Sequence, residues 1–123
     1  MSDEMPEEPL RPLTHAERGY IERLLTVGFP GREQIVEQLQ TVLARRIDTE
    51  GSIELVPQSS VRADVIKRVP VEGEAADVDG VPIYLLLHVV DSQVRELEIY
   101  KADGSPIKRM PPAELIDVVV LPA

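Results

Sequence analysis

The chain has 123 residues, enough for one domain, and its 22 acidic and 13 basic side chains give a formal net charge of −9. Because it contains no cysteine, disulfides, thiolate nucleophiles, iron–sulfur clusters and cysteine-ligated zinc are excluded within the chain. The acidic charge works against unassisted binding to nucleic acid, and it favours a basic protein partner or a surface that keeps the protein in solution.

The first nine residues are acidic and contain two prolines, so residues 1–9 are expected to form a disordered tail. This stretch lacks the positive and apolar regions of a secretory signal. The longest nearly apolar run, residues 81–90, is about half the length of a membrane-spanning helix, which needs ~20 residues. We therefore expect a cytoplasmic protein that binds neither membranes nor nucleic acid.

The segment after this tail has the pattern of an amphipathic helix. Thr14 and Glu17 form a capping-box pair, and apolar residues recur at helical spacing as far as Leu25. Because Gly28 supplies a stop signal, we predict a helix from Thr14 to Val27.

A second helix is predicted to begin at Pro30, with Ile35 and Leu39 on its apolar stripe. Its end is ambiguous, because residues 42–48 fit either a helix or an alternating strand. The change is expected between Val42 and Arg45.

Beyond residue 50 the apolar residues recur with a period of two, which is typical of strands. Strands are predicted over residues 51–57, 63–71, 81–90, 94–101 and 115–121, with a short helical turn at residues 113–116 as the alternative to the last. Within residues 94–101, Leu97 and Ile99 face one side with Arg95 and Lys101, and the other side carries Glu96, Glu98 and Tyr100. Pro70 places the predicted strand over residues 63–71 at an edge or a bulge, whereas residues 81–90 are apolar on both faces, as in a central strand packed under helices. The pattern predicts an α+β fold in a single domain, residues 10–123, with two N-terminal helices packed on one face of a four- to five-stranded, mostly antiparallel sheet.

An acidic stretch between two predicted strands raises the question of a calcium loop; it contains Glu72, Glu74, Asp77 and Asp79. Placing Gly80 at the sixth position of an EF-hand loop puts Ala75 at the first position and Leu86 at the twelfth, where carboxylates are required. We therefore interpret Asp79-Gly80 as a turn between strands, flanked by acids that keep the edge soluble.

Two histidines are the only imidazoles of the chain. His15 is expected at the surface of the first helix, and His88 within the central strand. A histidine zinc site needs carboxylate help, and the chain has no His-Glu-x-x-His spacing. His88 with Asp91 or Glu96 is an alternative as a general base, but a hydrogen-bonded sheet histidine is favoured. We expect no catalytic residue, no metal site and no cofactor.

Two segments resemble a family of small bacterial proteins of unknown function. Its pattern has an Arg-Pro-Leu-Thr helix start, an Asp-x-Asp-Gly hairpin, and a strand with Glu-Leu-Asp/Glu-x-aromatic-Lys/Arg-x-Asp. The matching positions here are Arg11, Pro12, Leu13 and Thr14; Asp77, Asp79 and Gly80; and Glu96, Leu97, Glu98, Tyr100, Lys101 and Asp103. The family brings no established activity, so the resemblance implies no catalytic residue. Small acidic α+β proteins also resemble the immunity proteins that neutralise bacterial toxins, by analogy of class.

The leading hypothesis is a non-enzymatic protein-binding module that presents an acidic surface to a basic partner. Its candidate partner-binding residues are Glu72, Glu74, Asp77, Asp79, Glu96, Glu98 and Tyr100. One alternative is a small-molecule binder or enzyme with His88 in a pocket between helices and sheet. Another is a structural homodimer that pairs through the edge strand at residues 115–121.

Overall fold

The computed structural model describes residues 8–120. Residues 1–7, most of the predicted tail, and Leu121, the predicted end of the last strand, lie outside the described residues. The elements are α1 (His15–Leu24), α2 (Arg32–Leu39), β1 (Leu43–Arg46), β2 (Ile53–Val56), β3 (Val71–Ala76), β4 (Pro82–Val90), β5 (Gln93–Lys101), the short 3-10 helix η1 (Ala113–Leu115) and β6 (Asp117–Val120).

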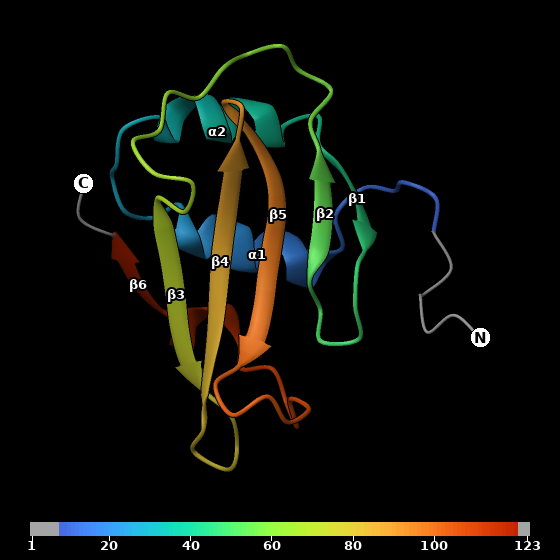
Figure 1. Ribbon diagram of the computed structural model, residues 1–123, viewed down its shortest axis with the longest axis vertical. Coiled ribbons are helices and arrows are strands. Elements are labelled where there is room, and N and C mark those ends of the chain that lie inside the picture. The colour runs from blue at the N-terminus through green and yellow to red at the C-terminus, as the bar shows by residue number, and fades with distance from the viewer. Residues whose placement is uncertain (1–7, 121–123) are drawn as a thin grey trace.

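The strands form one sheet in the order β1-β2-β5-β4-β3-β6, and every neighbouring pair is antiparallel. Both helices lie behind this sheet in the view of Figure 1. The predicted α+β class is therefore confirmed. Within residues 8–120 the sheet has six strands rather than four or five. One of them is the ambiguous stretch after the second helix, where Leu43 pairs with Val56 and Arg46 with Ile53.

The predicted capping box begins α1: Thr14 accepts a hydrogen bond from the backbone N–H of Glu17, whose carboxylate accepts one from the N–H of Thr14. Arg11 forms two further hydrogen bonds with Glu17, of 2.8 and 3.0 Å. The helix ends at Leu24, earlier than predicted, and the carbonyl of Leu25 accepts a hydrogen bond from Arg32 at the start of α2.

The second helix begins two residues later than predicted. Its N-cap is Gly31, with φ of 91°, a left-handed conformation that glycine adopts without steric cost. A side chain there would also meet Val65, since an added Cβ would lie 2.9 Å from that residue's Cγ1. The predicted start at Pro30 therefore belongs to the turn between the helices.

The predicted strand over residues 63–71 is wrong, because most of this stretch is an irregular loop. Pro70 has no N–H to donate to a ladder. Isolated hydrogen bonds hold the loop instead: Ala63 donates to the carbonyl of Ser92, and Val89 donates to that of Arg68. Alternation of apolar and basic residues did not distinguish this loop from a strand.

The acidic stretch, by contrast, is largely a strand and not a connection. Residues 72–76 belong to β3, which lies between β4 and β6. Gly73 lets the helical layer approach the sheet closely, because an added Cβ would lie 2.6 Å from Ile116 Cγ2 and 3.0 Å from Leu24 Cδ2. Only the Asp79-Gly80 part of the predicted turn is confirmed, with Gly80 at a φ of 84°.

The core lies between the helices and one face of the sheet. Alternate residues of β4 are buried toward it, and Ile21, Leu24 and Ile35 face them from the helices; the buried residues of β4 are Ile83, Leu85, Leu87 and Val89. Helices therefore cover only one face of β4, whereas the prediction had both faces apolar. No helix among the described residues is long and apolar enough to cross a membrane.

Candidate functional site

The sheet face turned away from the two helices is called the open face, and it faces the viewer in Figure 1. The alternation of β3 and β5 places most of the predicted partner-binding residues on it, because their neighbours Gly73, Leu97 and Ile99 are buried on the opposite side. The residues of the open face used below are Glu72, Glu74, Tyr84, His88, Glu96, Glu98 and Tyr100.

Two tyrosines lie side by side on the open face. Tyr84 and Tyr100 are directly paired across β4 and β5, with ring centroids 5.4 Å apart and planes inclined by 37°. The carboxylate of Glu74, which is directly opposite Tyr84 across β3 and β4, is the largest cause of a raised pKa of the Tyr84 hydroxyl, and burial is the second. Tyr100 is 40% exposed, so its ring is available for contact with another molecule.

His88 lies at the other end of this face, with partners that fix its proton. Its Nε2 is 2.8 Å from Glu98 Oε1, and its Nδ1 accepts a hydrogen bond of 3.0 Å from Arg68 Nε. Because an arginine is always a donor, Nδ1 of the neutral ring carries no hydrogen, so Nε2–H donates to Glu98. Glu96 is directly opposite His88 in the β4–β5 register.

This position corrects the pocket proposed from the sequence. His88 points away from the helices, so it cannot line a pocket between helices and sheet. The hydrogen-bonded sheet histidine agrees with the favoured interpretation of that residue. A separate hollow of about 290 Å³ lies between α1 and α2, lined among others by Leu13, Leu25 and Val36.

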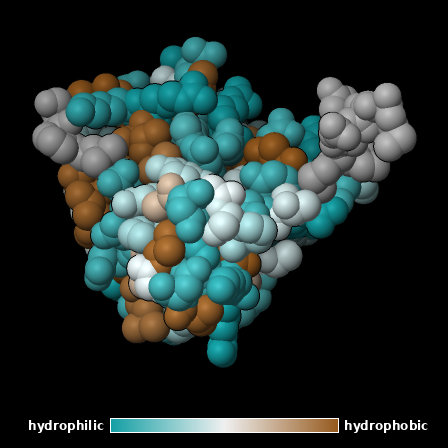
Figure 2. All heavy atoms as spheres, turned by 60° about the horizontal axis from the view of Figure 1, so that its bottom comes forward, coloured by the Kyte–Doolittle hydropathy of each residue, from teal (hydrophilic) through white to brown (hydrophobic). Residues whose placement is uncertain are grey.

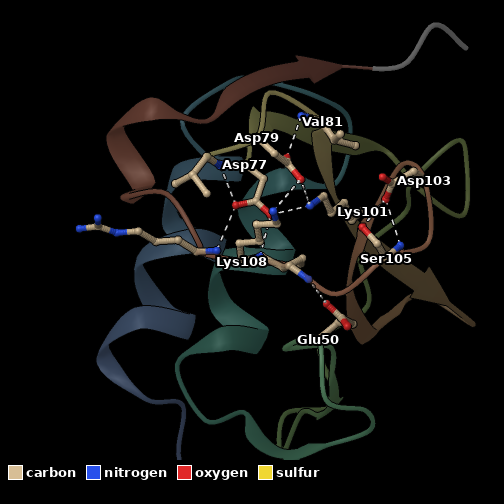
Figure 3. A network of polar contacts seen from close by, with 11 residues as sticks. Glu50, Asp77, Asp79, Val81, Lys101, Asp103, Ser105 and Lys108 are labelled. Atoms are coloured by element: carbon tan, nitrogen blue, oxygen red, sulfur yellow. Dashed lines mark hydrogen bonds and ion pairs between the residues drawn. The ribbon is translucent and has the colours of Figure 1, made fainter.

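The two aspartates of the acidic stretch are not on the open face. Asp77 is 4% exposed, and the ammonium group of Lys101 lies between it and Asp79, at 2.9 and 2.6 Å (Figure 3). Lys101 itself is 2% exposed. The cation that these carboxylates hold is therefore a side chain of the protein, and Asp77 does not contribute to an acidic surface.

Asp77 also binds the segment that follows β5. It accepts hydrogen bonds from the backbone N–H groups of Lys108 at 2.7 Å, Arg109 at 3.0 Å and Val78 at 2.7 Å. Burial by itself raises the pKa of Asp77, but these bonds and the one from Lys101 outweigh it and hold that pKa well below its ordinary value.

The pKa shifts of Asp79 and Lys101 also favour the charged form of each group. The hydrogen bond from Lys101 lowers the pKa of Asp79, and the hydrogen bond to Asp79 raises the pKa of Lys101. Around this ion-pair cluster of Asp77, Asp79 and Lys101, the end of the molecule that carries the β3–β4 turn has hydrophobic groups interspersed among hydrophilic ones (Figure 2). Val78, in that turn, is 67% exposed. The ion-pair cluster thus joins the β3–β4 turn to the chain after β5 and has a structural role.

These observations define the protein as an α+β domain in which helices cover one face of the sheet and leave the other face open. The chain belongs to the family described as Domain of unknown function (DUF6984), which matches residues 10–111. The comparisons with curated proteins and with solved structures find no match.

Three partners of the site residues could not be read from the sequence. Arg68 reaches His88 from a loop that the pattern assigned to a strand. Glu98 meets His88 because of strand pairing, and Tyr84 meets Tyr100 for the same reason. The alternation of β5 is the one signal in the sequence that grouped Glu96, Glu98 and Tyr100 correctly.

Proposed function

We propose that this protein is a non-enzymatic protein-binding module whose open face receives a basic protein partner. The observation that carries the proposal is the gathering of four glutamates and Tyr100 on one face of the sheet. Glu74 and Tyr100 are exposed there, and Glu72, Glu96 and Glu98 are half-buried. The residues come from β3 and β5, on either side of β4, so strand pairing fixes their spacing.

The charges of this face favour a cationic partner. Among the described residues, no lysine or arginine forms an ion pair with Glu72, Glu74 or Glu96. The negative charge of these carboxylates is therefore not offset by such an ion pair, and the formal net charge of −9 adds to the negative potential. Such a potential accelerates encounter with a basic surface and disfavours acidic partners.

The tyrosine pair supplies the contact that charge alone does not. An aromatic ring loses little conformational entropy on binding, and tyrosine is enriched among the residues that dominate interface energies. Tyr100 rests against Tyr84 and lies on the same face as the glutamates. We infer that Tyr100 is the anchor and that the glutamates surround it. A toxin neutralised in the manner of the immunity proteins is one such basic partner.

The test is affinity capture from the native host at low salt with matched variants. Glu96→Lys with Glu98→Lys reverses two charges on the open face, and Glu22→Lys with Glu37→Lys makes the same change in charge on the exposed sides of α1 and α2. A basic protein retained by the wild type and the helix variant, but lost from the open-face variant, supports the proposal. No selectively retained protein, or equal retention by all three, contradicts it.

A second candidate function is a homodimer that pairs through β6, which is the outermost strand at one edge of the sheet. Val119 is 47% exposed there, and Leu115, just before the strand, is 64% exposed. Unpaired edges with apolar side chains favour strand pairing between copies. Light scattering over a range of concentrations tests this, because a monomer mass at every concentration removes the dimer.

A further inference from the structure

Three metal-ligating side chains converge on the open face. One donor atom each from His88, Glu96 and Glu98 lies within 4.8 Å of the others. We propose that these three residues bind a divalent transition-metal ion with the preferences of Zn²⁺, and that Arg68 competes with the metal for His88. This metal site does not depend on the proposed protein partner, and it can be tested with the purified chain alone.

The donor set is appropriate to this class of metal. One imidazole nitrogen and two carboxylate oxygens suit zinc or copper, whereas calcium and magnesium prefer oxygen donors only. Tetrahedral zinc with ligands at about 2.1 Å separates its donors by roughly 3.4 Å. His88 Nε2 and Glu98 Oε1 are now 2.8 Å apart, so they need to move apart only slightly to admit the ion. The fourth position is left to water.

The scaffold holds these donors with little freedom. His88 lies on β4, and Glu96 and Glu98 on β5, the two strands at the middle of the sheet. The His88 side chain is only 13% exposed and that of Glu98 is 38% exposed. A site on adjacent central strands is organised before the metal arrives, which reduces the conformational cost of binding.

The local charges also favour a cation. Glu96 is directly opposite Glu54 on β2, and like charges in that position destabilise a sheet. Arg45 already offsets Glu54 through an ion pair of 2.6 Å. A dication bound to Glu96 and Glu98 therefore relieves repulsion that the remaining carboxylates of the open face create.

Arg68 determines which form of the ring is present without metal. Its Nε donates to Nδ1 of His88, which places the ring hydrogen on Nε2, the atom that faces the carboxylates. Zinc bound at Nε2 requires that hydrogen to be on Nδ1, where it collides with the donor of Arg68. Metal binding therefore requires Arg68 to release His88, and loss of the guanidinium favours the metal.

Isothermal titration of the full chain with zinc chloride, in buffer without chelators, tests the site. We expect one zinc per chain, binding at least about tenfold weaker in His88→Gln, and binding roughly tenfold tighter in Arg68→Gln, where the amide oxygen can accept the Nδ1 hydrogen. Glu72→Gln, on the same face but outside the cluster, is the matched control and is expected to bind as the wild type does.

A second measurement identifies the ligand directly. The electron paramagnetic resonance spectrum of bound Cu²⁺ is expected to show coupling to one imidazole nitrogen in the wild type and none in His88→Gln. Glu98→Gln, nearly isosteric, is a second ligand variant in case the histidine change disturbs the sheet, which circular dichroism reports. Absence of saturable zinc binding, or equal affinity in the wild type and His88→Gln, overturns the site. Unchanged or weaker binding by Arg68→Gln overturns the competition.

Discussion

The buried side chain of Gln38 is predicted to contribute strongly to the free energy of unfolding through its hydrogen bonds. It lies on α2 and is fully buried. Its Nε2 donates to the carbonyls of Val61 and Ser92, each at 2.8 Å, and its Oε1 accepts from the N–H of Val94 at 2.9 Å. One amide therefore joins α2, the irregular loop after β2 and the turn between β4 and β5.

Gln38→Met keeps the length and approximate volume of the side chain but removes all three bonds. Each intramolecular hydrogen bond contributes about 1 kcal/mol net, and a buried group left unpaired costs about 1–3 kcal/mol. Because methionine fills the space, the cavity term is small. We expect the free energy of unfolding to fall by about 3 kcal/mol, with the N–H of Val94 responsible for the largest part.

Urea denaturation followed by circular dichroism measures this loss. Gln40→Met, at the exposed C-cap position of the same helix, is the matched control and is expected to change stability by less than about 0.5 kcal/mol. Three hydrogen bonds lead us to expect a loss of about 3 kcal/mol in the free energy of unfolding of Gln38→Met. A loss below about 1 kcal/mol would show that this amide does not hold the three segments together.

Three further predictions concern packing and charge. Gly73→Ala is expected to lower the free energy of unfolding by about 1–3 kcal/mol in urea denaturation, because its Cβ would overlap Ile116. Since the pKa of Asp77 is lowered by folding, the unfolded chain takes up this proton first; stability measured by denaturation should fall as the pH drops below about 4, and less steeply in Asp77→Asn. Glu74→Gln is expected to lower the pKa of Tyr84, seen in the alkaline absorbance titration of the tyrosines.

Each of these predictions has a control within the chain. Gly28→Ala adds the same methyl group where nothing lies within 4 Å of it, so a loss equal to that of Gly73→Ala removes the overlap argument. Asp64→Asn, on an exposed loop, is expected to keep the acid dependence of the wild type. An unchanged alkaline titration in Glu74→Gln contradicts the effect of Glu74 on the pKa of Tyr84, and Glu96→Gln is the matched change on β5.

Local signals predicted the features that local chemistry decides. The capping box of Thr14 and Glu17 fixed the start of α1 to within a residue, because both of its hydrogen bonds are made within four residues. Alternation along β5 separated Leu97 and Ile99 from Glu96 and Glu98, since a strand has a period of two. The open face was thereby anticipated in part.

Features that depend on distant partners were not predictable in this way. β3 has small and acidic residues with little strand preference, but it pairs with β4 and β6, and the close helical layer requires Gly73. Lys101 was expected on the same side of its strand as Leu97 and Ile99, but the sequence did not reveal that Asp77 and Asp79, at the end of the β3–β4 hairpin, form ion pairs with it. The contact of Glu98 with His88 comes from the β4–β5 register, which the sequence did not reveal.

Whether the open face receives a basic partner is best tested by the rate at which the captured and purified partner associates with the protein. We predict that the rate constant at low salt falls by about tenfold or more in the Glu96→Lys and Glu98→Lys double variant, and that the difference shrinks as salt is raised. The Glu22→Lys and Glu37→Lys double variant should associate much more nearly at the wild-type rate, because its changed charges lie on the helices. Equal rates for the wild type and the open-face variant at low salt would contradict the account.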